Sequence, residues 1–201
     1  MQYKACVPMI AEVDAENSAS SMAYKANSGK AVGKLMNVKV DQTRSNVKAY
    51  GDDGVAEEIN QFVSATVTLD ATFVPADCEK PMFGNTYTAA TTGQNPTPET
   101  IVDSESDDPG YTGFGFVYCD RQNGADVYRL YWLYKVKWTN PNDDFTTKKE
   151  NIEFKNPSIT GTAYAGPDGK WRKRETYATA AAALSALETL AQKPATVSSG
   201  T

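Results

Sequence analysis

The chain has 201 residues, of which 40% are hydrophobic, and a formal net charge of −5, so it is long enough for one domain with a buried core. It contains no histidine, which excludes Ser-His-Asp and Cys-His catalysis and every metal site that needs an imidazole. The cysteines, Cys6, Cys78 and Cys119, are widely spaced and form no paired motif, which is typical of buried free thiols in a reducing compartment.

The first third of the chain predicts two strands after an irregular start. Residues 1–32 are polar and weakly patterned, and we expect an N-terminal arm or loop region there. Apolar and polar residues alternate over 34–50 and again over 64–74, so each segment predicts a strand with one dry and one wet face. A Gly-Asp-Asp-Gly turn follows the first strand, and residues 55–60 are expected to be a polar connection.

The next segment predicts a short helix and a long loop. Residues 76–83 follow a proline and end at Gly84, which suits the left-handed position after a helix. Residues 85–110 contain several prolines, threonines and acidic residues without a visible period, so we expect a long surface loop. A loop of this length in a compact domain is usually functional or contacts a partner.

The centre of the fold is expected to be an aromatic hairpin. Residues 113–119 and 126–138 predict two strands, and Asn123-Gly124 between them is typical of a tight hairpin turn. Gly113 and Gly115 indicate a bulge or a close approach of the backbone to a neighbour. Strict alternation in the second strand predicts one apolar face made of Tyr128, Leu130, Trp132, Tyr134, Val136 and Trp138. We expect the core to include Phe114, Phe116, Tyr128, Leu130, Trp132 and Tyr134.

Further strands are predicted over 147–155 and 158–164, followed by an amphipathic helix over 178–192. The predicted fold is mainly β: an antiparallel β-sandwich with one short helix and a C-terminal amphipathic helix, in a domain spanning 33–192 before a flexible tail, 193–201. We expect no transmembrane helix, because no apolar run approaches 18 residues, and no secretory signal.

No pattern in the chain indicates catalysis or a cofactor. Its glycines form no phosphate-binding motif, and a pair of carboxylates acting on a glycoside would need a coincidence of Asp and Glu. Two binding alternatives stay open. Trp132 and Trp138 would suit a carbohydrate-binding β-sandwich involved in host attachment if that face were exposed, and the basic stretch 171–174 would suit a nucleic-acid patch.

Charge is unevenly distributed along the chain. Residues 1–50 carry seven Lys and Arg against four Asp and Glu, residues 51–110 carry one against twelve, and residues 111–201 carry twelve against nine. The acidic middle segment is either simply solvated or faces a basic surface of another copy, since complementary patches set the register of assemblies.

A series of short motifs in a fixed order carries a family resemblance. They are Tyr50-Gly-Asp-Asp-Gly54, Glu57-Glu58, Phe62, Ala65-Thr-Val-Thr-Leu69, Met82-Phe-Gly84, Gly113-Phe-Gly-Phe116, Tyr134-Lys-Val-Lys137, Lys149-Glu-Asn-Ile-Glu-Phe154, Ile159-Thr-Gly-Thr162 and Gly169-Lys-Trp-Arg172. None is specific alone, but their order over residues 35–190 resembles the major tail tube proteins of long-tailed bacteriophages, in particular those of phages and prophages of Gram-positive bacteria.

The resemblance implies a structural virion protein and no enzyme. Such proteins form hexameric rings that stack head to tail into a hollow tube, and each subunit is a β-sandwich that contributes strands to a continuous inner barrel through which DNA is ejected. The implied partners are copies of the chain itself, other tail proteins such as the tape measure and the terminator, and phage DNA that passes non-specifically; no membrane is implied. The implied location is the virion tail, assembled in the host bacterial cytoplasm. A tail terminator or connector of similar fold would form one ring and stop.

Two sets of residues are expected to act in such a tube. The wet faces of the first two strands would line the lumen, although on a monomeric sheet they would simply face solvent. The lumen-facing candidates are Asn37, Lys39, Asp41, Thr66, Thr68, Asp70 and Thr72. The segment after the first strand would reach an adjoining subunit and meet a basic surface there. The inter-subunit candidates are Asp52, Asp53, Glu57, Glu58 and Phe62.

Overall fold

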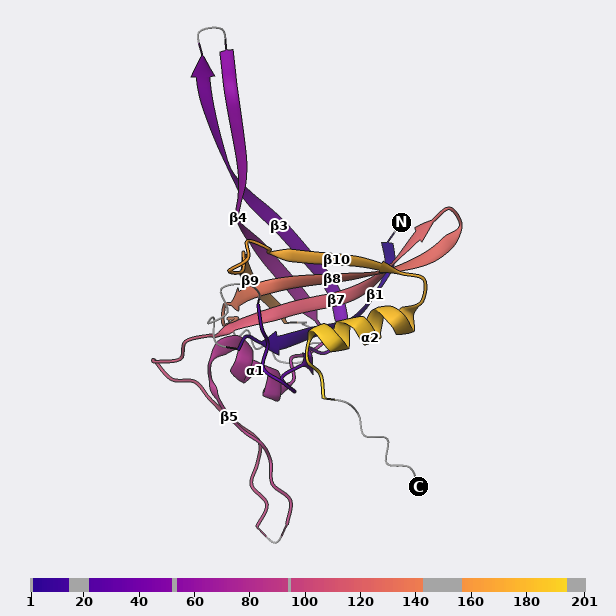
Figure 1. Ribbon diagram of the computed structural model, residues 1–201. Coiled ribbons are helices and arrows are strands. Elements are labelled where there is room, and N and C mark those ends of the chain that lie inside the picture. Colours follow the sequence, from indigo (N-terminus) through magenta and orange to yellow (C-terminus); the bar gives the residue numbers. More distant parts are fainter. Residues whose placement is uncertain (1, 15–21, 52–53, 94, 143–156, 195–201) are drawn as a thin grey trace, which may run out of the picture.

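A computed structural model describes residues 2–14, 22–51, 54–93, 95–142 and 157–194, with side chains for all of these except 2–6, 47, 49–51 and 54–57. The described chain is mainly β, its strand pairs are antiparallel, and it has two helices (Figure 1). The strands are β1 Gln2–Glu12, β2 Lys30–Ala31, β3 Leu35–Gly51, β4 Gly54–Ala71, β5 Thr86–Thr88, β6 Thr100–Val102, β7 Tyr111–Gln122, β8 Ala125–Trp138, β9 Ser158–Tyr164 and β10 Arg172–Tyr177. The helices are α1 Ala76–Phe83 and α2 Ala180–Leu190.

The main sheet runs β2-β1-β7-β8-β9-β4-β3 and branches at β8. One edge of β8 pairs with β7 along its length, while the other pairs first with β10 and then, beyond Tyr134, with β9. At the branch the Tyr134 N–H donates to the Trp171 carbonyl at 3.2 Å. The strands β9, β4 and β3 therefore turn away and cross the β7–β8 layer, as in a β-sandwich (Figure 1). The described strands do not close into a barrel within one chain, because β3 and β2 end the path.

A β-bulge in β8 changes which side chains share a face. Thr112 pairs with Val136, but the next pair is Phe114 with Leu133, so β8 contributes one extra residue there. The alternation therefore shifts at Tyr134–Lys135. The prediction of one six-residue face is wrong for Val136 and Trp138, which pack on the opposite side from Trp132.

Two clusters on the two sides of β7–β8 form the core. On one side α2 covers Trp132, Leu130 and Val117; on the other, α1, β4 and β9 cover Phe114, Leu133 and Trp138. Both helices have identifiable ends. Thr179 caps α2 by accepting from the Ala182 N–H at 3.3 Å, and α1 ends at Gly84 in the left-handed conformation with φ 83°, as predicted.

The strands differ from the sequence predictions in four places. Residues 2–12, expected to belong to an arm or loop region, form β1 between β2 and β7. The expected polar connection 55–60 belongs to β4, which pairs with β3 as far as Gly51 and Gly54. The expected loop 85–110 contains the two-stranded β5–β6 ribbon, and the basic stretch after Trp171 forms β10. The predicted strand 147–155 lies outside the described residues.

Other predictions are confirmed. The Asn123-Gly124 turn has positive φ at both residues, 50° and 81°, and closes the β7–β8 hairpin. The strand 158–164 and the C-terminal helix also form. Neither helix in the described residues is long and apolar enough to span a membrane.

Candidate functional site

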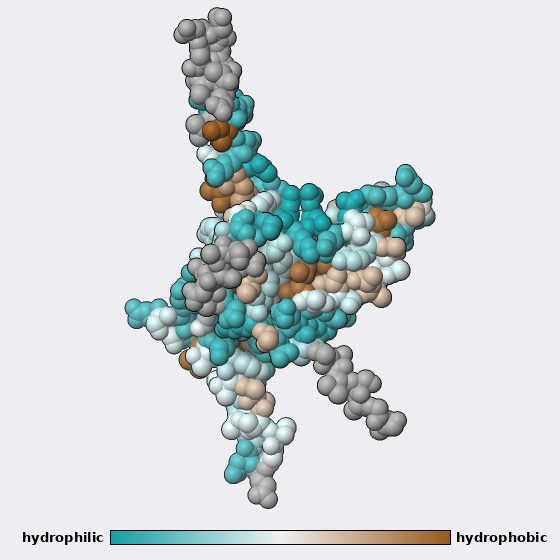
Figure 2. Space-filling model, viewed as in Figure 1, coloured by the Kyte–Doolittle hydropathy of each residue, from teal (hydrophilic) through white to brown (hydrophobic). Residues whose placement is uncertain are grey.

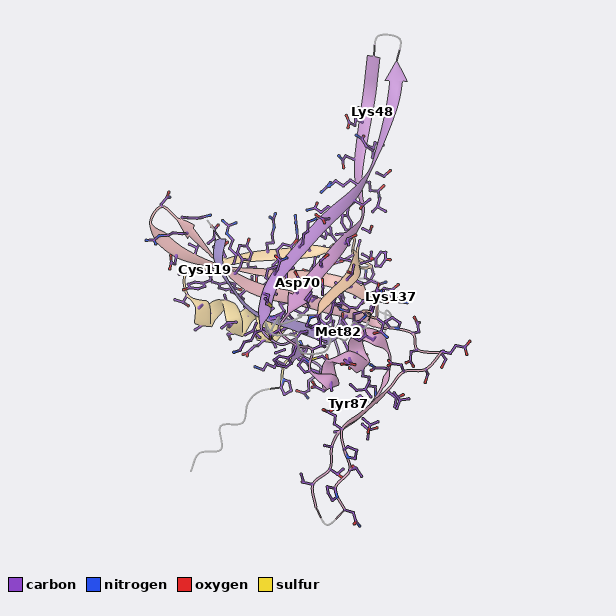
Figure 3. All side chains as sticks on the ribbon, turned by 180° about the vertical axis from the view of Figure 1, so that it is seen from behind. Lys48, Asp70, Met82, Tyr87, Cys119 and Lys137 are labelled. Carbon is purple, nitrogen blue, oxygen red and sulfur yellow. The ribbon has the colours of Figure 1, made fainter. Side chains whose placement is uncertain are left out.

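The outer side of β3, β4 and β9 is a continuous polar face. Side chains of directly opposite residues share one face of a sheet, so three register rows define it. The rows across β3, β4 and β9 are Asn37–Asp70–Ser158, Lys39–Thr68–Thr160 and Asp41–Thr66–Thr162. The inward residues of the same strands, among them Val67, Leu69 and Ile159, are fully buried. The alternation predicted from the sequence is therefore present in the fold, and Figure 3 shows Asp70 on this side of the molecule.

The one lysine in the three register rows of the polar face has a carboxylate partner in the same rows. The Lys39 ammonium lies 2.6 Å from a carboxylate oxygen of Asp41, and the Asn37 amide donates to Asp70 at 3.0 Å. Because Lys39 and Asp41 are both more than half exposed, this pair adds little stability. The pair matters for charge, because the Asp41 carboxylate offsets the positive charge of the Lys39 ammonium. Thr72, the remaining lumen candidate, follows the end of β4 and accepts from the Lys34 N–H at 3.2 Å.

The second feature is a projecting hairpin, which we call the arm: residues 45–51 of β3 and 54–61 of β4. These parts of the two strands pair with each other, and Figure 1 shows them extending well beyond the body. Ile59 and Val63, at the arm and its root, are 55% and 53% exposed. Figure 2 shows hydrophobic side chains among the hydrophilic surface of this projection. A two-stranded ribbon is marginally stable by itself, so the arm is a segment that a partner would stabilise.

Two of the inter-subunit candidates, Glu57 and Glu58, lie on the arm. Asp52 and Asp53 lie outside the described residues, and the backbone of Glu57 pairs with Ala49. Glu58 is exposed, and its carboxylate accepts from Asn46 at 2.6 Å. The sequence predicts a self-repelling acidic cluster without nearby cations. The prediction that no cation is near is wrong for Glu58, because Lys48 lies directly opposite it in the register.

Phe62 packs within its own chain. It is half-buried and stacks on Trp171, with ring centroids 4.3 Å apart and planes 10° apart. The guanidinium of Arg172, the first residue of β10, lies 4.3 Å from the Trp171 ring and donates to the Tyr131 hydroxyl at 3.2 Å. Phe62 therefore anchors the root of the arm to its own chain, and its inter-subunit role stays a prediction.

The predicted core residues lie inside, and this bears on the carbohydrate alternative. Phe114, Phe116, Leu130 and Trp132 are buried, and Tyr128 and Tyr134 are half-buried and pack against the α2 cluster. Trp132 and Trp138 are 0% and 1% exposed, so neither indole offers a face on which a sugar could stack.

Each buried indole has a hydrogen-bond partner. Trp132 Nε1 donates to the Tyr24 hydroxyl and Trp138 Nε1 to the Thr112 hydroxyl, at 2.9 and 2.8 Å. Burial raises the pKa of the Tyr24 phenol above its ordinary value, and that hydroxyl donates to the Tyr134 carbonyl at 2.9 Å. Both tryptophans act as structural residues here.

Sequence reasoning missed two parts of these surfaces. The serine and threonines of β9 alternate with buried residues, so the pattern could have assigned them to the polar face, but their neighbour in the sheet was unknown. Trp171 gave no periodic signal, because it lies between a turn and a charged strand.

Within the described part of the chain, no three Cys, Asp or Glu side chains gather as metal ligands would. Comparisons with known protein families and with curated proteins found no match to this chain.

Proposed function

We propose that this chain is the tail tube subunit of a long-tailed bacteriophage, which polymerises into stacked rings around a channel for DNA. The proposal rests on the sequence resemblance and on two surfaces that a lone domain does not need. Copies would pair around the ring, so that the barrel implied by the resemblance is completed by several chains. The implied contacts with a tape measure and a terminator belong to this proposal too.

The observation that carries the proposal is the arm. Its strands pair only with each other in the described chain beyond the Arg44–Phe62 pair, and its root is fixed by the Phe62–Trp171 stack. A rigid root with an unsupported ribbon is suited to reach another copy. A contact between different surfaces of successive copies is heterologous, and such a contact propagates a filament instead of closing a dimer.

The polar face supports the channel part of the proposal. Each phosphate neutralised by a protein cation adds salt-dependent affinity, so a conduit for DNA should offer few unpaired cations. Threonine, serine and asparagine dominate this face, and Lys39 lies beside Asp41. The face would therefore allow DNA to slide without holding it.

An arm-deletion variant tests the proposal. Replacing residues 45–61 with Asn-Gly joins Arg44 to Phe62, which are opposite each other in the register, and retains the Phe62–Trp171 stack. We expect a folded monomer with a native circular dichroism spectrum that forms no polymer at concentrations where the intact protein pellets. Polymers from the deletion variant would refute the assigned role of the arm. Single rings from the intact protein would favour a terminator or connector.

A further inference from the structure

The basic stretch around β10 separates into two faces with different charge balance. Lys173 pairs opposite Trp132 and faces α2, while Arg172 and Arg174 pair opposite Leu133 and Tyr131 and face the other side. Lys173 is matched within the chain, since its ammonium lies 2.9 Å from Glu175. That contact also lowers the pKa of the Glu175 carboxyl, first through its hydrogen bond to Lys173. In the same stretch Lys170 is matched by Asp168 at 3.0 Å.

The two arginines lack such partners. Among the described residues, no carboxylate forms an ion pair with Arg172 or Arg174, and Arg174 is exposed. Arg129 lies on the same face, opposite Thr176, and its guanidinium is 3.4 Å from a carboxylate oxygen of Asp120. We call Arg129, Tyr131, Arg172 and Arg174 the arginine face. Arginine and tyrosine are the residue types enriched in protein–protein interfaces, because they combine contact area with oriented donors.

The same chain carries a matching acidic surface, residues 99–108, which we call the acidic segment. Between Lys80 and Arg121 the sequence has no cation. Asp103 and Glu105 are exposed and have no ion-pair partner among the described residues. Their neighbours hold the segment in shape: Asp107 accepts from the Ser104 N–H at 2.7 Å, and Asp108 lies 2.8 Å from Lys137. A segment ordered before binding loses less entropy on binding.

We propose that the arginine face is the docking surface for the acidic segment of a second copy of this chain. The inference rests on the proposed function and adds a contact distinct from the arm. Charge complementarity selects this partner, since one surface has unmatched guanidinium groups and the other has unmatched carboxylates. Arginine suits the contact better than lysine, because its planar fork can hold a carboxylate through two hydrogen bonds.

A matched pair of variants in β10 tests the arginine face. Arg174→Gln and Lys173→Gln each remove one positive charge from neighbouring positions, but on opposite faces of the strand. The readout is the lowest protein concentration that yields pelletable polymer, with circular dichroism as the check on folding. We expect Arg174→Gln to raise that concentration about twofold to fivefold and Lys173→Gln to leave it unchanged. Equal effects of the two variants would overturn the inference.

A charge exchange identifies the occupant. Arg174→Glu should abolish polymer at the wild-type concentration, and adding Asp103→Lys and Glu105→Lys to the same chain should restore it. Restoration by Asp52→Lys and Asp53→Lys instead would assign the face to the acidic residues between β3 and β4 and overturn the proposal. Normal polymerisation of Arg174→Glu with weakened DNA binding would assign the face to phosphates, with the same consequence. Wild-type protein that never polymerises would refute the proposed function itself, together with this inference.

Discussion

Gly113 packs directly against the Trp132 indole, so a larger residue there should destabilise the fold. A Cβ added at Gly113 would come closer than 3.0 Å to the Trp132 indole and to the Tyr24 ring, both of which belong to side chains in the buried α2 cluster. We expect Gly113→Ala to cost about 1–3 kcal/mol of unfolding free energy through overpacking. Trp132→Ala should cost about 3–5 kcal/mol, since the indole is fully buried and its removal leaves a cavity.

Combining the two substitutions separates packing from other causes. The added methyl group enters the space that the indole leaves, so the double variant should be more stable than the sum of the single effects by about 1–3 kcal/mol. Urea unfolding followed by circular dichroism measures all four proteins, with Trp132→Leu replacing Trp132→Ala if the latter is insoluble. Gly110→Ala is the control glycine, because nothing lies within 4 Å of its added Cβ, and its effect should be additive with that of Trp132→Ala.

Additive effects of Gly113→Ala and Trp132→Ala would refute the close contact between the indole and the β7 backbone. A stable Trp132→Ala variant that had lost only affinity for glycans would refute the structural role of this tryptophan and favour the carbohydrate alternative.

Three further predictions concern the channel, the arm and a buried thiol. Asp70→Lys should leave tube assembly intact but slow DNA ejection, because each copy adds to the polar face a cation that attracts phosphates. Ejection at the normal rate would show that this face does not line the lumen. Neutralising the acidic residues of the arm together with the two aspartates between its strands should raise the concentration needed for polymerisation. Added salt should do the same, because it shortens the electrostatic screening length, to about 8 Å at physiological strength. The substitutions are Asp52→Asn, Asp53→Asn, Glu57→Gln and Glu58→Gln, and tubes formed at the wild-type concentration would show that the arm makes no electrostatic contact. Burial raises the pKa of the Cys78 thiol from 9.0 to about 12, so the thiol is neutral in both states below pH 9. Above pH 9 unfolding releases its proton, and the unfolding free energy should fall by about 1.4 kcal/mol per pH unit relative to Cys78→Ala; parallel pH profiles of the two proteins would contradict this.

The parts of the fold that the sequence predicts are those where one face is buried and the other is wet. Alternation places the inner and outer residues correctly over 37–41 of β3 and 65–71 of β4, and the Asn123-Gly124 turn fixes the central hairpin. Met36 and Phe73, which the same alternation assigns to the dry faces, are exposed instead. The lumen candidates on β3 and β4 share one face for this reason. Exposure to solvent and exposure to a water-filled channel select the same residue types, so the channel belongs to the proposed function and not to the pattern.

The parts that the sequence does not predict lack such an inside–outside contrast. Met9, Ile10 and Ala11 in β1 are all buried, because both faces of this strand are covered, so no alternation is visible. The arm has the opposite property. Its described side chains, at 45, 46, 48 and 58–61, are all exposed, and residues 55–60 resemble a loop in sequence although they continue the β3–β4 ladder. The β8 bulge depends on the pairing with β7, and periodicity within one strand contains no information about its partner.

Negative-stain electron microscopy of the purified intact protein over a range of concentrations tests whether this chain is a tail tube subunit. Tail tube subunits should form hollow tubes of constant diameter with a regular axial repeat, and the arm-deletion variant prepared in parallel should form none. Particles that remain monomeric at every concentration and salt strength, or that stop at a single ring, would contradict the assignment as a tail tube subunit.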